Sequence, residues 1–276
     1  MNYKELTPVQ NVDGLLIKRE DLFAPFGIKD VNGGKLRQCL ALCDGVKDRY
    51  KGIISACSIH SPQAPITCAC AEYYGLPCTI YYGGTTPQLL IKQPMAKLCI
   101  KHKGKCKIVA HTGRHNVLYG KARKFAEENN YFVVEYGVNI LDHEDLLFDA
   151  VADQVINIPD ELDSLWVTCG SGITTIGILL GLEKYRKKVK EVHLVATAPN
   201  REEKIKKYSN AKYFMHDLFH EKNFAYEKGE HVIYNGIRLH PLYEAKTFKE
   251  MLKNNVDMKN GKNLLWIVGA EAQIGG

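Results

Sequence analysis

A glycine-rich turn in the second half of the chain has the residue types that bind a phosphate. It joins an apolar stretch to a helical pattern, and it contains Gly170, Ser171, Gly172, Thr174 and Thr175. Such a turn presents backbone N–H groups and hydroxyls at a helix N-terminus, where a negative charge is stabilised. The same residues also form plain strand-to-helix turns capped by Ser or Thr, so the turn alone leaves both interpretations open.

Two common phosphate ligands do not fit the spacing of this turn. A dinucleotide site has Gly-x-Gly-x-x-Gly, whereas here four residues separate Gly172 from Gly177. The next expected strand, 191–197, also ends without the acidic residue that binds a ribose. A nucleoside triphosphate site needs Gly-Lys followed by Ser or Thr, and none follows Gly177. The turn therefore favours a phosphate-bearing cofactor of another kind.

A lysine that directly follows two glycines is a candidate nucleophile. Lys35 comes after Gly33 and Gly34, at the start of an expected helix. Glycines let the backbone approach a ligand closely, and a lysine that has lost its proton attacks an aldehyde. Most lysines at helix starts are exposed surface residues, however, so Lys35 taken by itself indicates little.

Short apolar runs alternate with helical patterns along the chain, which predicts an α/β fold with a mostly parallel sheet. We expect strands at 15–18, 52–56, 78–82, 106–110, 131–136, 164–168, 191–197 and 264–268. We expect helices near 35–47, 62–74, 88–103, 114–129, 143–157, 173–189 and 244–254. Residues 52–136 contain enough of these elements for a small sheet domain, and the rest of the chain supplies a second sheet.

The composition is that of an ordinary globular protein. The chain has 276 residues, 45% hydrophobic and 25% charged, which allows one large or two modest domains. The net charge of +6 suits an anionic ligand but is small for a dedicated nucleic-acid binder. Nine cysteines without a Cys-x-x-Cys pair favour a reducing compartment. Because no run approaches the roughly 18 apolar residues that cross a bilayer, we expect a cytoplasmic protein without membrane contact.

Other clusters of polar residues do not predict a separate chemistry. His111 and His115 lack the Glu of a zinc-binding helix, and the cysteine pairs lie in apolar helical patterns, so we expect no metal. Two lysine-rich segments, 97–107 and 184–190, are typical of solvated faces, and the alternative is an anionic substrate.

Five motifs, in order along nearly the whole chain, resemble those of the fold-type II pyridoxal 5'-phosphate (PLP) enzymes. The sequence is most similar to 1-aminocyclopropane-1-carboxylate deaminase and D-cysteine desulfhydrase. Residues 7–10 resemble Thr-Pro-Ile-Gln, 18–21 match Lys-Arg-Glu-Asp, and 33–37 resemble Gly-Gly-Asn-Lys-x-Arg. Residues 170–174 resemble the phosphate loop Gly-Ser-Gly-Gly-Thr, and 235–246 resemble Glu-Gly-x-x-x-Asp-Pro-Val-Tyr-Glu-Gly-Lys.

The resemblance implies PLP as the cofactor and gives each motif a role. Lys35 becomes the Schiff-base lysine, and the 170–175 loop binds the cofactor phosphate. Glu244 lies beside the pyridine nitrogen, where a carboxylate favours the protonated ring that stabilises a carbanion at Cα. Tyr243 and His60 are candidates for proton transfer, and Ser58 for binding the substrate carboxylate. Each also has an ordinary structural interpretation, as a packed tyrosine, a loop histidine, a Ser cap or a helix-start glutamate.

The resemblance also implies the domain organisation and the assembly. We expect a two-domain, three-layer αβα protein with open twisted sheets. Residues 1–45 and 150–276 form the large PLP-binding domain, and residues 46–149 form the small αβ domain. The resemblance further implies a homodimer.

Departures from the family pattern bear on the substrate. Ile59 stands where the family has an asparagine against the cofactor's ring oxygen, and Gly34 replaces the asparagine before the lysine. The form of the lysine motif is also similar to PLP proteins of bacteriophage thymidine hypermodification, which would act in the host cytoplasm. We therefore favour decarboxylation, rearrangement or elimination on an amino acid attached to thymidine in DNA. The alternatives are a deaminase or desulfhydrase of a small free amino acid, and a PLP-fold binding protein without turnover.

Overall fold

The computed structural model describes residues 2–138, 143–199, 201–221 and 228–269. The chain divides into two compact units, which are described separately here. Unit 1 takes in the described residues of 1–23 and 147–270, and unit 2 takes in residues 24–146. The sequence placed the first boundary after residue 45, whereas the compact units divide after Phe23, so residues 24–45 group with unit 2.

Unit 1 is built on a six-stranded sheet in the order β1-β2-β12-β7-β8-β9. The strands are β1 (Val9–Val12), β2 (Leu15–Arg19), β7 (Glu161–Cys169), β8 (Lys188–Ala196), β9 (Phe214–Asp217) and β12 (Asn263–Ile267). β1 runs antiparallel to β2, and every other pair in this sheet is parallel. The carboxyl ends of β12, β7 and β8 therefore lie side by side at one edge of the sheet, the position where open α/β sheets bind ligands.

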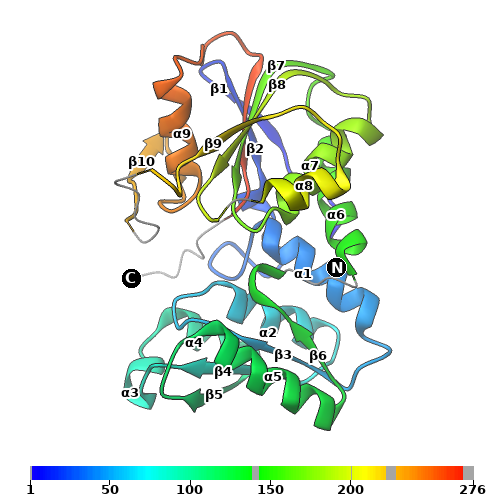
Figure 1. Ribbon diagram of the computed structural model, residues 1–276, viewed down its shortest axis with the longest axis vertical. Helices are drawn as coiled ribbons and strands as arrows, with labels where there is room; N and C mark the ends of the chain where they lie inside the picture. Colours follow the sequence, from blue (N-terminus) through cyan, green and yellow to red (C-terminus); the bar gives the residue numbers. More distant parts are fainter. Residues whose placement is uncertain (1, 139–142, 200, 222–227, 270–276) are drawn as a thin grey trace. The chain divides into compact units, whose positions relative to one another are not determined.

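Helices pack on the sheet of unit 1 (Figure 1). α9 (Glu244–Lys253) places Phe248 and Met251 in a buried cluster with Trp166, Leu265 and Ile17 of the strands. α7 (Ile173–Lys184) packs on β7 and contacts α8 (Glu202–Tyr208). The remaining elements of this part are the 3-10 turns Glu20–Leu22 and Asp153–Val155 and the hairpin β10 (Val232–Tyr234) and β11 (Ile237–Leu239). Loops, and not these helices, directly follow the carboxyl ends of β7, β8 and β12.

Two glycines let α7 approach the segment 147–155 closely. An added Cβ at Gly177 would lie 2.7 Å from Val151 Cβ, and one at Gly181 would lie 2.6 Å from the Ala152 carbonyl oxygen. Real Cβ atoms do not make contacts this short. Gly177, the last glycine of the sequence motif at 170–177, therefore serves helix packing.

Unit 2 has a parallel four-stranded sheet in the order β5-β4-β3-β6 with helices on both faces (Figure 1). The strands are β3 (Gly52–Ala56), β4 (Cys78–Gly83), β5 (Lys105–Ala110) and β6 (Tyr131–Val134). The helices are α1 (Gly34–Val46), α2 (Gln63–Tyr73), α3 (Pro87–Leu90), α4 (Pro94–Lys101), α5 (His115–Asn129), α6 (Glu144–Ala152), which continues into unit 1, and a 3-10 turn at Tyr136–Val138.

Alternate residues of the unit 2 strands face different helices. Ile54 and Ala56 of β3 pack with Leu118 and Ala122 of α5 in one buried cluster. Ser55, between them, accepts a hydrogen bond of 3.1 Å from Gln63 Nε2 at the start of α2. This alternation is the period of two that a pleated strand imposes. The sheet is therefore the middle layer of three.

The segment that leads into α1 is held by a buried ionic network. Asp30 is 2% exposed and accepts a hydrogen bond of 2.8 Å from His102 Nε2 and another from Lys101. His102 Nδ1 lies 2.9 Å from Glu72 Oε2 on the other side of the ring. Burial alone would raise the pKa of Asp30, but the bonds from Lys101 and His102 outweigh it and lower the pKa. The network fixes the chain four residues before the start of α1.

The α/β class, the two sheets and all eight expected strands are confirmed. The expected helix at 88–103 is wrong as one element, because Pro94 lacks an N–H and holds Gln93 in extended backbone, so α3 and α4 form instead. The expected helix at 173–189 ends at Lys184, before β8 begins at Lys188. Short elements that the patterns missed are β1, α8, β9 and the hairpin of β10 and β11.

A substitution at Gly181 tests the close packing of α7. Gly181→Ala should lower the free energy of unfolding by about 1–3 kcal/mol, because the new methyl group overpacks against the Ala152 backbone and Val155. Gly120→Ala in α5 is the control, since an added Cβ there meets no atom within 4 Å. That change should raise stability by about 0.5–1 kcal/mol, the helix preference for Ala over Gly. Urea denaturation measures both, and equal effects would contradict the packing argument.

Candidate functional site

The glycine-rich turn joins β7 to α7 as the sequence predicts. Gly172 is the N-cap of α7 and adopts φ +84°, a left-handed conformation that favours glycine. Its carbonyl oxygen accepts the hydrogen bond of Ile176 N at 2.9 Å. The N–H groups of the first helical turn have no partner within a helix and point out of its N-terminus. An added Cβ at Gly170 would meet nothing within 4 Å, so there is open space on this side of the loop.

Two buried hydroxyls at this edge of the sheet lack a partner. Thr175 is 1% exposed and Thr197 is 0% exposed, and neither hydroxyl makes a hydrogen bond of good geometry in the described part of the chain. Thr175 lies within reach of the Cys169 thiol, and Thr197 N donates to the Cys169 carbonyl oxygen at 3.1 Å. Because buried polar atoms are normally paired, these two hydroxyls indicate a polar group that completes the site.

Glu244 is a buried carboxylate with one oxygen satisfied and one not. It is 0% exposed at the start of α9, and its Oε1 accepts hydrogen bonds from Val268 N at 2.8 Å and Gly269 N at 3.1 Å. Oε2 is buried and has no partner among the described residues. Burial raises the pKa of Glu244 to about 7, which its backbone hydrogen bonds oppose. A cationic N–H donor beside Oε2 would satisfy this oxygen and favour the carboxylate form.

Glu244 and the glycine-rich loop at 170–175 lie at the same edge of the unit 1 sheet. The two N–H donors to Glu244 directly follow β12, which pairs with β7, and the loop directly follows β7. Thr168 near the end of β7 also lies 2.6 Å from the Thr247 hydroxyl, one turn into α9. The sheet therefore brings together two motifs that are about 70 residues apart in the sequence.

Tyr243 comes directly before Glu244 and is half-buried. Its ring lies 4.6 Å from the ring of His240, centroid to centroid, at an angle of 31°. The His240 Nδ1 accepts a hydrogen bond of 3.2 Å from Leu242 N, which fixes the orientation of the imidazole. Tyr243 therefore packs against the oriented imidazole of His240 at the start of α9, and it directly precedes Glu244 in the chain.

Lys35 lies in the first turn of α1, as expected. Gly33 precedes the helix with φ +88°, and its carbonyl oxygen accepts hydrogen bonds from Leu36 N and Arg37 N. The Lys35 side chain is half-buried, and Asn32 Oδ1 nearby is buried without a partner among the described residues. The two glycines therefore do what the sequence suggests: they begin a helix in a tight backbone turn with the lysine at its start.

Ser58, Ile59 and His60 form the turn between β3 and α2. Ser58 Oγ accepts the His60 N–H at 3.3 Å, so the serine caps its own turn, while both side chains remain exposed. Gln63 holds the base of the turn, because its amide bonds Ser55 Oγ, the Glu135 carbonyl oxygen and the Gly137 N–H. Hydrogen bonds of Gln63 therefore hold the end of the turn nearest α2, while Ser58 and His60 remain exposed to solvent.

Cys57, directly before this turn, connects it with Lys35 inside unit 2. Burial raises the pKa of the Cys57 thiol to about 12, and the positive charge of Lys35 opposes that rise. Lys35 and the turn after β3 are therefore within electrostatic reach of each other. The predicted site residues fall into two groups, Lys35 with Ser58 and His60 in unit 2, and the loop with Tyr243 and Glu244 in unit 1.

Three polar residues at the edge of the unit 1 sheet were not singled out from the sequence. Thr197 directly follows β8, Arg201 precedes α8, and Tyr213 precedes β9. The expected strand at 191–197 ends at Thr197, and polar residues at the carboxyl ends of parallel strands are candidates for ligand binding. This position could therefore have identified Thr197 from the sequence. The sequence contains no comparable signal for Arg201 or Tyr213, because its patterns do not predict α8 or β9.

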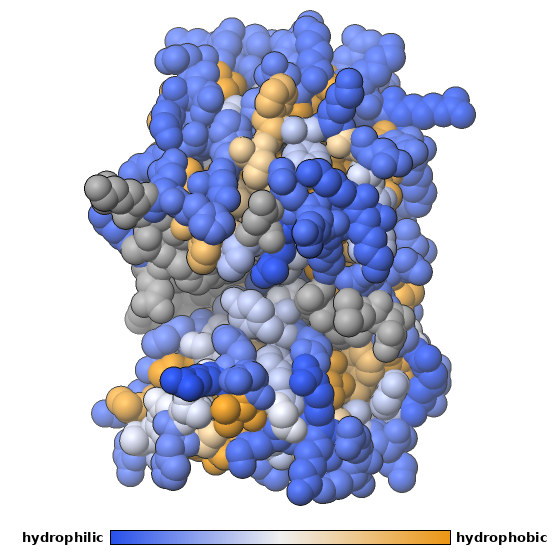
Figure 2. All heavy atoms as spheres, in the orientation of Figure 1, coloured by the Kyte–Doolittle hydropathy of each residue, from blue (hydrophilic) through white to orange (hydrophobic). Residues whose placement is uncertain are grey.

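The lysine-rich segment 184–190 does not form a free basic patch. Its lysines pair with acidic residues of the chain before and within β7, and the N–O distances are 2.6–3.0 Å. The pairs are Lys184–Asp153, Lys187–Asp160, Lys188–Glu161 and Lys190–Asp163. In the other segment, Lys101 and Lys103 also have carboxylate partners. Figure 2 shows that hydrophilic side chains cover much of the surface in view.

Within the described part of the chain, no group of three or more His, Cys, Asp or Glu side chains is placed to hold a metal ion. No described helix has the length and apolar character that crossing a membrane requires.

The raised pKa of Glu244 predicts a pH-dependent stability of the cofactor-free protein. A glutamate whose pKa rises from about 4.5 to about 7 on folding stabilises the fold at low pH and loses this contribution as the pH passes through 7. Relative to Glu244→Gln, the wild type should lose about 3 kcal/mol of unfolding free energy between about pH 5 and about pH 8.

Urea denaturation at the two pH values measures this difference. Glu161→Gln is the control, because the Glu161 side chain is 72% exposed and its removal should leave the pH dependence unchanged. A difference between wild type and Glu244→Gln that is the same at both pH values would show that the Glu244 carboxylate is not held in a desolvated environment.

Comparison with known proteins identifies the fold. No protein-family model and no curated protein sequence matches the chain. A crystal structure described as an ACC deaminase homologue matches with a TM-score of 0.73 and 20% identity, over 96% of this chain and 89% of that chain. A PLP-dependent aspartate racemase matches with a TM-score of 0.65 and 13% identity, over 99% and 92%.

Serine racemase from Dictyostelium discoideum matches with a TM-score of 0.64 and 13% identity, over 96% of this chain and 92% of that chain. In these matches the similarity covers almost the whole of this chain, both units included. The fold is therefore that of the fold-type II PLP enzymes, as the sequence motifs imply.

Proposed function

We propose that this protein is a PLP-dependent enzyme that breaks a bond at Cα of an amino-acid substrate. The observation that carries the proposal is the free oxygen of the buried Glu244 carboxylate, at the same sheet edge as the loop before α7. A carboxylate left unpaired in a buried position costs several kcal/mol, so a ligand with a cationic N–H accounts for it. The pyridine ring of PLP has such a group, and its phosphate suits the helix N-terminus.

The residues present fit this cofactor. Bound PLP supplies an electron sink for negative charge that develops at Cα. Lys35 would hold its aldehyde carbon, and the N–H groups and hydroxyls of residues 170–175 would hold its phosphate. Glu244 would keep the ring nitrogen protonated through charge pairing.

Three further side chains would act on the substrate. Tyr243 carries a hydroxyl that can deliver or remove a proton at carbon, and His60 is the second candidate for proton transfer. Ser58 would bind the substrate carboxylate at the turn before α2. The exposed position of Ser58 and His60 is compatible with this task, since both side chains are accessible to a molecule in solution.

For the substrate, we propose an amino acid attached to a nucleotide of the thymidine type. Ile59 removes a hydrogen-bonding group at a position where the family enzymes for free amino acids have asparagine, and Gly34 alters the lysine motif. A remodelled pocket is expected where the amino acid carries a large substituent. The pairing of the lysines at 184–190 with carboxylates means that this segment does not support DNA binding, so the proposal rests on the motif departures.

A pigment test examines the cofactor proposal. The purified protein with added PLP should be yellow, should lose this absorbance on borohydride reduction, and should then carry a reduced pyridoxyl adduct on Lys35. Lys35→Ala should give no adduct, whereas Lys29→Ala, which removes an exposed lysine of the same unit, should behave as wild type. A colourless protein that takes up no PLP, or an adduct on another lysine, would refute the assignment.

A substrate screen decides between the two substrate classes. The holoenzyme should release carbon dioxide or ammonia from, or rearrange, amino-acyl-thymidine DNA, with little turnover of free amino acids. Tyr243→Phe should lower kcat on the true substrate about 100-fold or more while PLP binding persists, because a proton-transfer group typically contributes 10²–10⁴. Turnover of free amino acids alone would favour the deaminase and desulfhydrase class. A yellow protein inactive on both classes would favour a binding protein.

A further inference from the structure

We propose that Arg201 is a charged anchor for the cofactor phosphate, added to the N–H groups and hydroxyls of the loop before α7. This inference rests on the proposed function. It assigns a binding role to an arginine that no motif contains and that comes from a separate segment, the turn between β8 and α8.

The first observation is the position of the Arg201 stem. An added Cβ at Gly172 would lie 3.4 Å from Arg201 Cβ and 3.7 Å from Arg201 Cγ, so the stem lies directly over the N-cap of α7. This packing places the side chain at the loop itself and not elsewhere on the surface of unit 1. The positive charge of Arg201 also acts on the Cys169 thiol at the end of β7.

The second observation is that the arginine lacks a partner. Arg201 Nε is buried and makes no hydrogen bond in the described part of the chain, and no ion pair there joins Arg201 to a carboxylate. Four lysines at 184–190, by contrast, each have an acidic partner. A buried guanidinium N–H without an acceptor is costly, so the site is complete only with an anion.

The third observation is electrostatic. Arg201 lies against the N-terminus of α7, whose unpaired N–H groups carry a partial positive charge, and it also occupies the N-cap of α8. A cation at a helix N-terminus is unfavourable by itself. An anion bound between the Arg201 guanidinium and the α7 N-terminus would interact favourably with both positive charges. The unpaired hydroxyls of Thr175 and Thr197 lie at the same strand ends and add donors for it.

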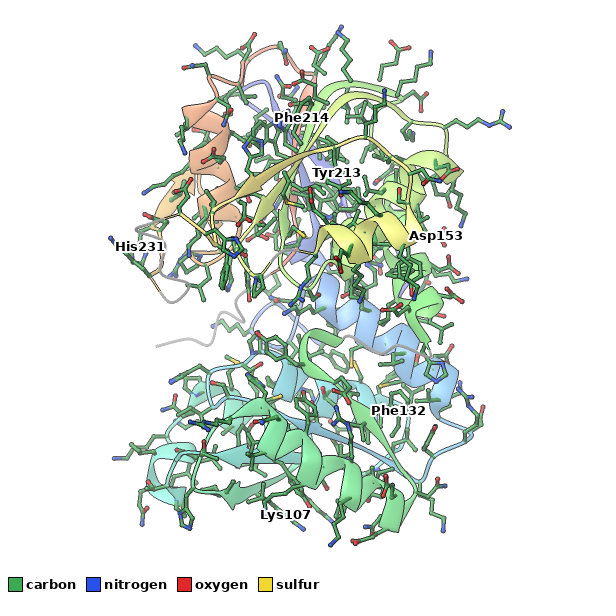
Figure 3. All side chains as sticks on the ribbon, in the orientation of Figure 1. Lys107, Phe132, Asp153, Tyr213, Phe214 and His231 are labelled. Atoms are coloured by element: carbon green, nitrogen blue, oxygen red, sulfur yellow. The ribbon has the colours of Figure 1, made fainter. Side chains whose placement is uncertain are left out.

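Tyr213 extends this group of donors. Its hydroxyl is buried and has no partner among the residues that the structure describes. Burial raises the pKa of Tyr213, and the nearby Cys169 thiol at the end of β7 raises it further. Figure 3 labels Tyr213 directly before β9, beside α8. A phosphate accepts several hydrogen bonds at once, and arginine binds it in a forked geometry. The shared chemistry of these groups is therefore recognition of a phosphate dianion.

The test compares PLP with pyridoxal, which is the same ring without the phosphate. Arg201→Gln should weaken PLP binding about 10- to 100-fold, the range for loss of a charge-assisted hydrogen bond, and should leave pyridoxal binding unchanged. Arg201→Lys should restore part of the affinity. Arg186→Gln is the matched control, because Arg186 is exposed just beyond the opposite end of α7. Absorbance titration gives the affinities, and circular dichroism verifies the fold of each variant.

Further binding measurements separate a failure of the Arg201 proposal from a failure of the proposed function. Equal PLP affinity of Arg201→Gln and Arg186→Gln would overturn the proposal, and so would a loss of pyridoxal binding equal to the loss of PLP binding. If Arg201→Gln binds PLP normally but the PLP-loaded variant loses binding of thymidine 5'-monophosphate, the arginine serves a substrate phosphate and the cofactor assignment is wrong. If the wild type binds neither PLP nor pyridoxal, the proposed function fails, and weaker binding of inorganic phosphate by Arg201→Gln would still support an anion site.

Discussion

The buried carboxylate of Glu244 constrains much of unit 1. Removing a carboxylate from water costs several kcal/mol, and two backbone N–H groups directly after β12 offset part of this cost. They are available only because the start of α9 lies against the end of β12. One interaction therefore fixes the end of a central strand, the start of a helix, and the half-buried tyrosine that precedes it. The same geometry leaves Oε2 without a donor in the described ranges of the chain.

The unpaired buried charged groups at the strand ends of unit 1 differ from the paired surface lysines around β7 and β8. Lysines around β7 and β8 have carboxylates within 3.0 Å. Asp30, His102 and Glu72 form an ionic network that Lys101 and Lys103 also join. Pairs of this kind neutralise the surface and contribute little stability when exposed. Against this background, Arg201 with an unpaired Nε and Glu244 with an unpaired oxygen stand apart. The positive net charge of the chain is therefore less informative than the place where single charges remain unmatched.

The sequence predicted the elements whose residues form long apolar patterns, and it missed those that do not. The edge strands β1 and β9 are four residues long and half-buried or exposed, so their patterns resemble loops. The motifs at Lys35, 170–175 and 243–244 were found because each is contiguous. Arg201 and Tyr213 were missed because their proximity to the loop depends on the order β7-β8-β9, which is a property of the folded sheet. The unit boundary after Phe23 likewise depends on packing that composition does not reveal.

Several of the buried polar atoms that lack a partner among the described residues lie next to the motifs. Thr175, Thr197, Arg201 and Glu244 lie at the strand ends of unit 1, and Asn32 lies three residues before Lys35. Elsewhere, Gln63 is fully bonded with three partners, whereas Thr85 Oγ1 and Trp266 Nε1 are also buried without a partner among the described residues. Each unpaired buried polar atom costs about 1–3 kcal/mol, so the group of them at the strand ends of unit 1 calls for a physical explanation. The stability lost at these positions is the expected cost of a preformed site, and it is regained when a ligand with a phosphate and a cationic N–H is bound.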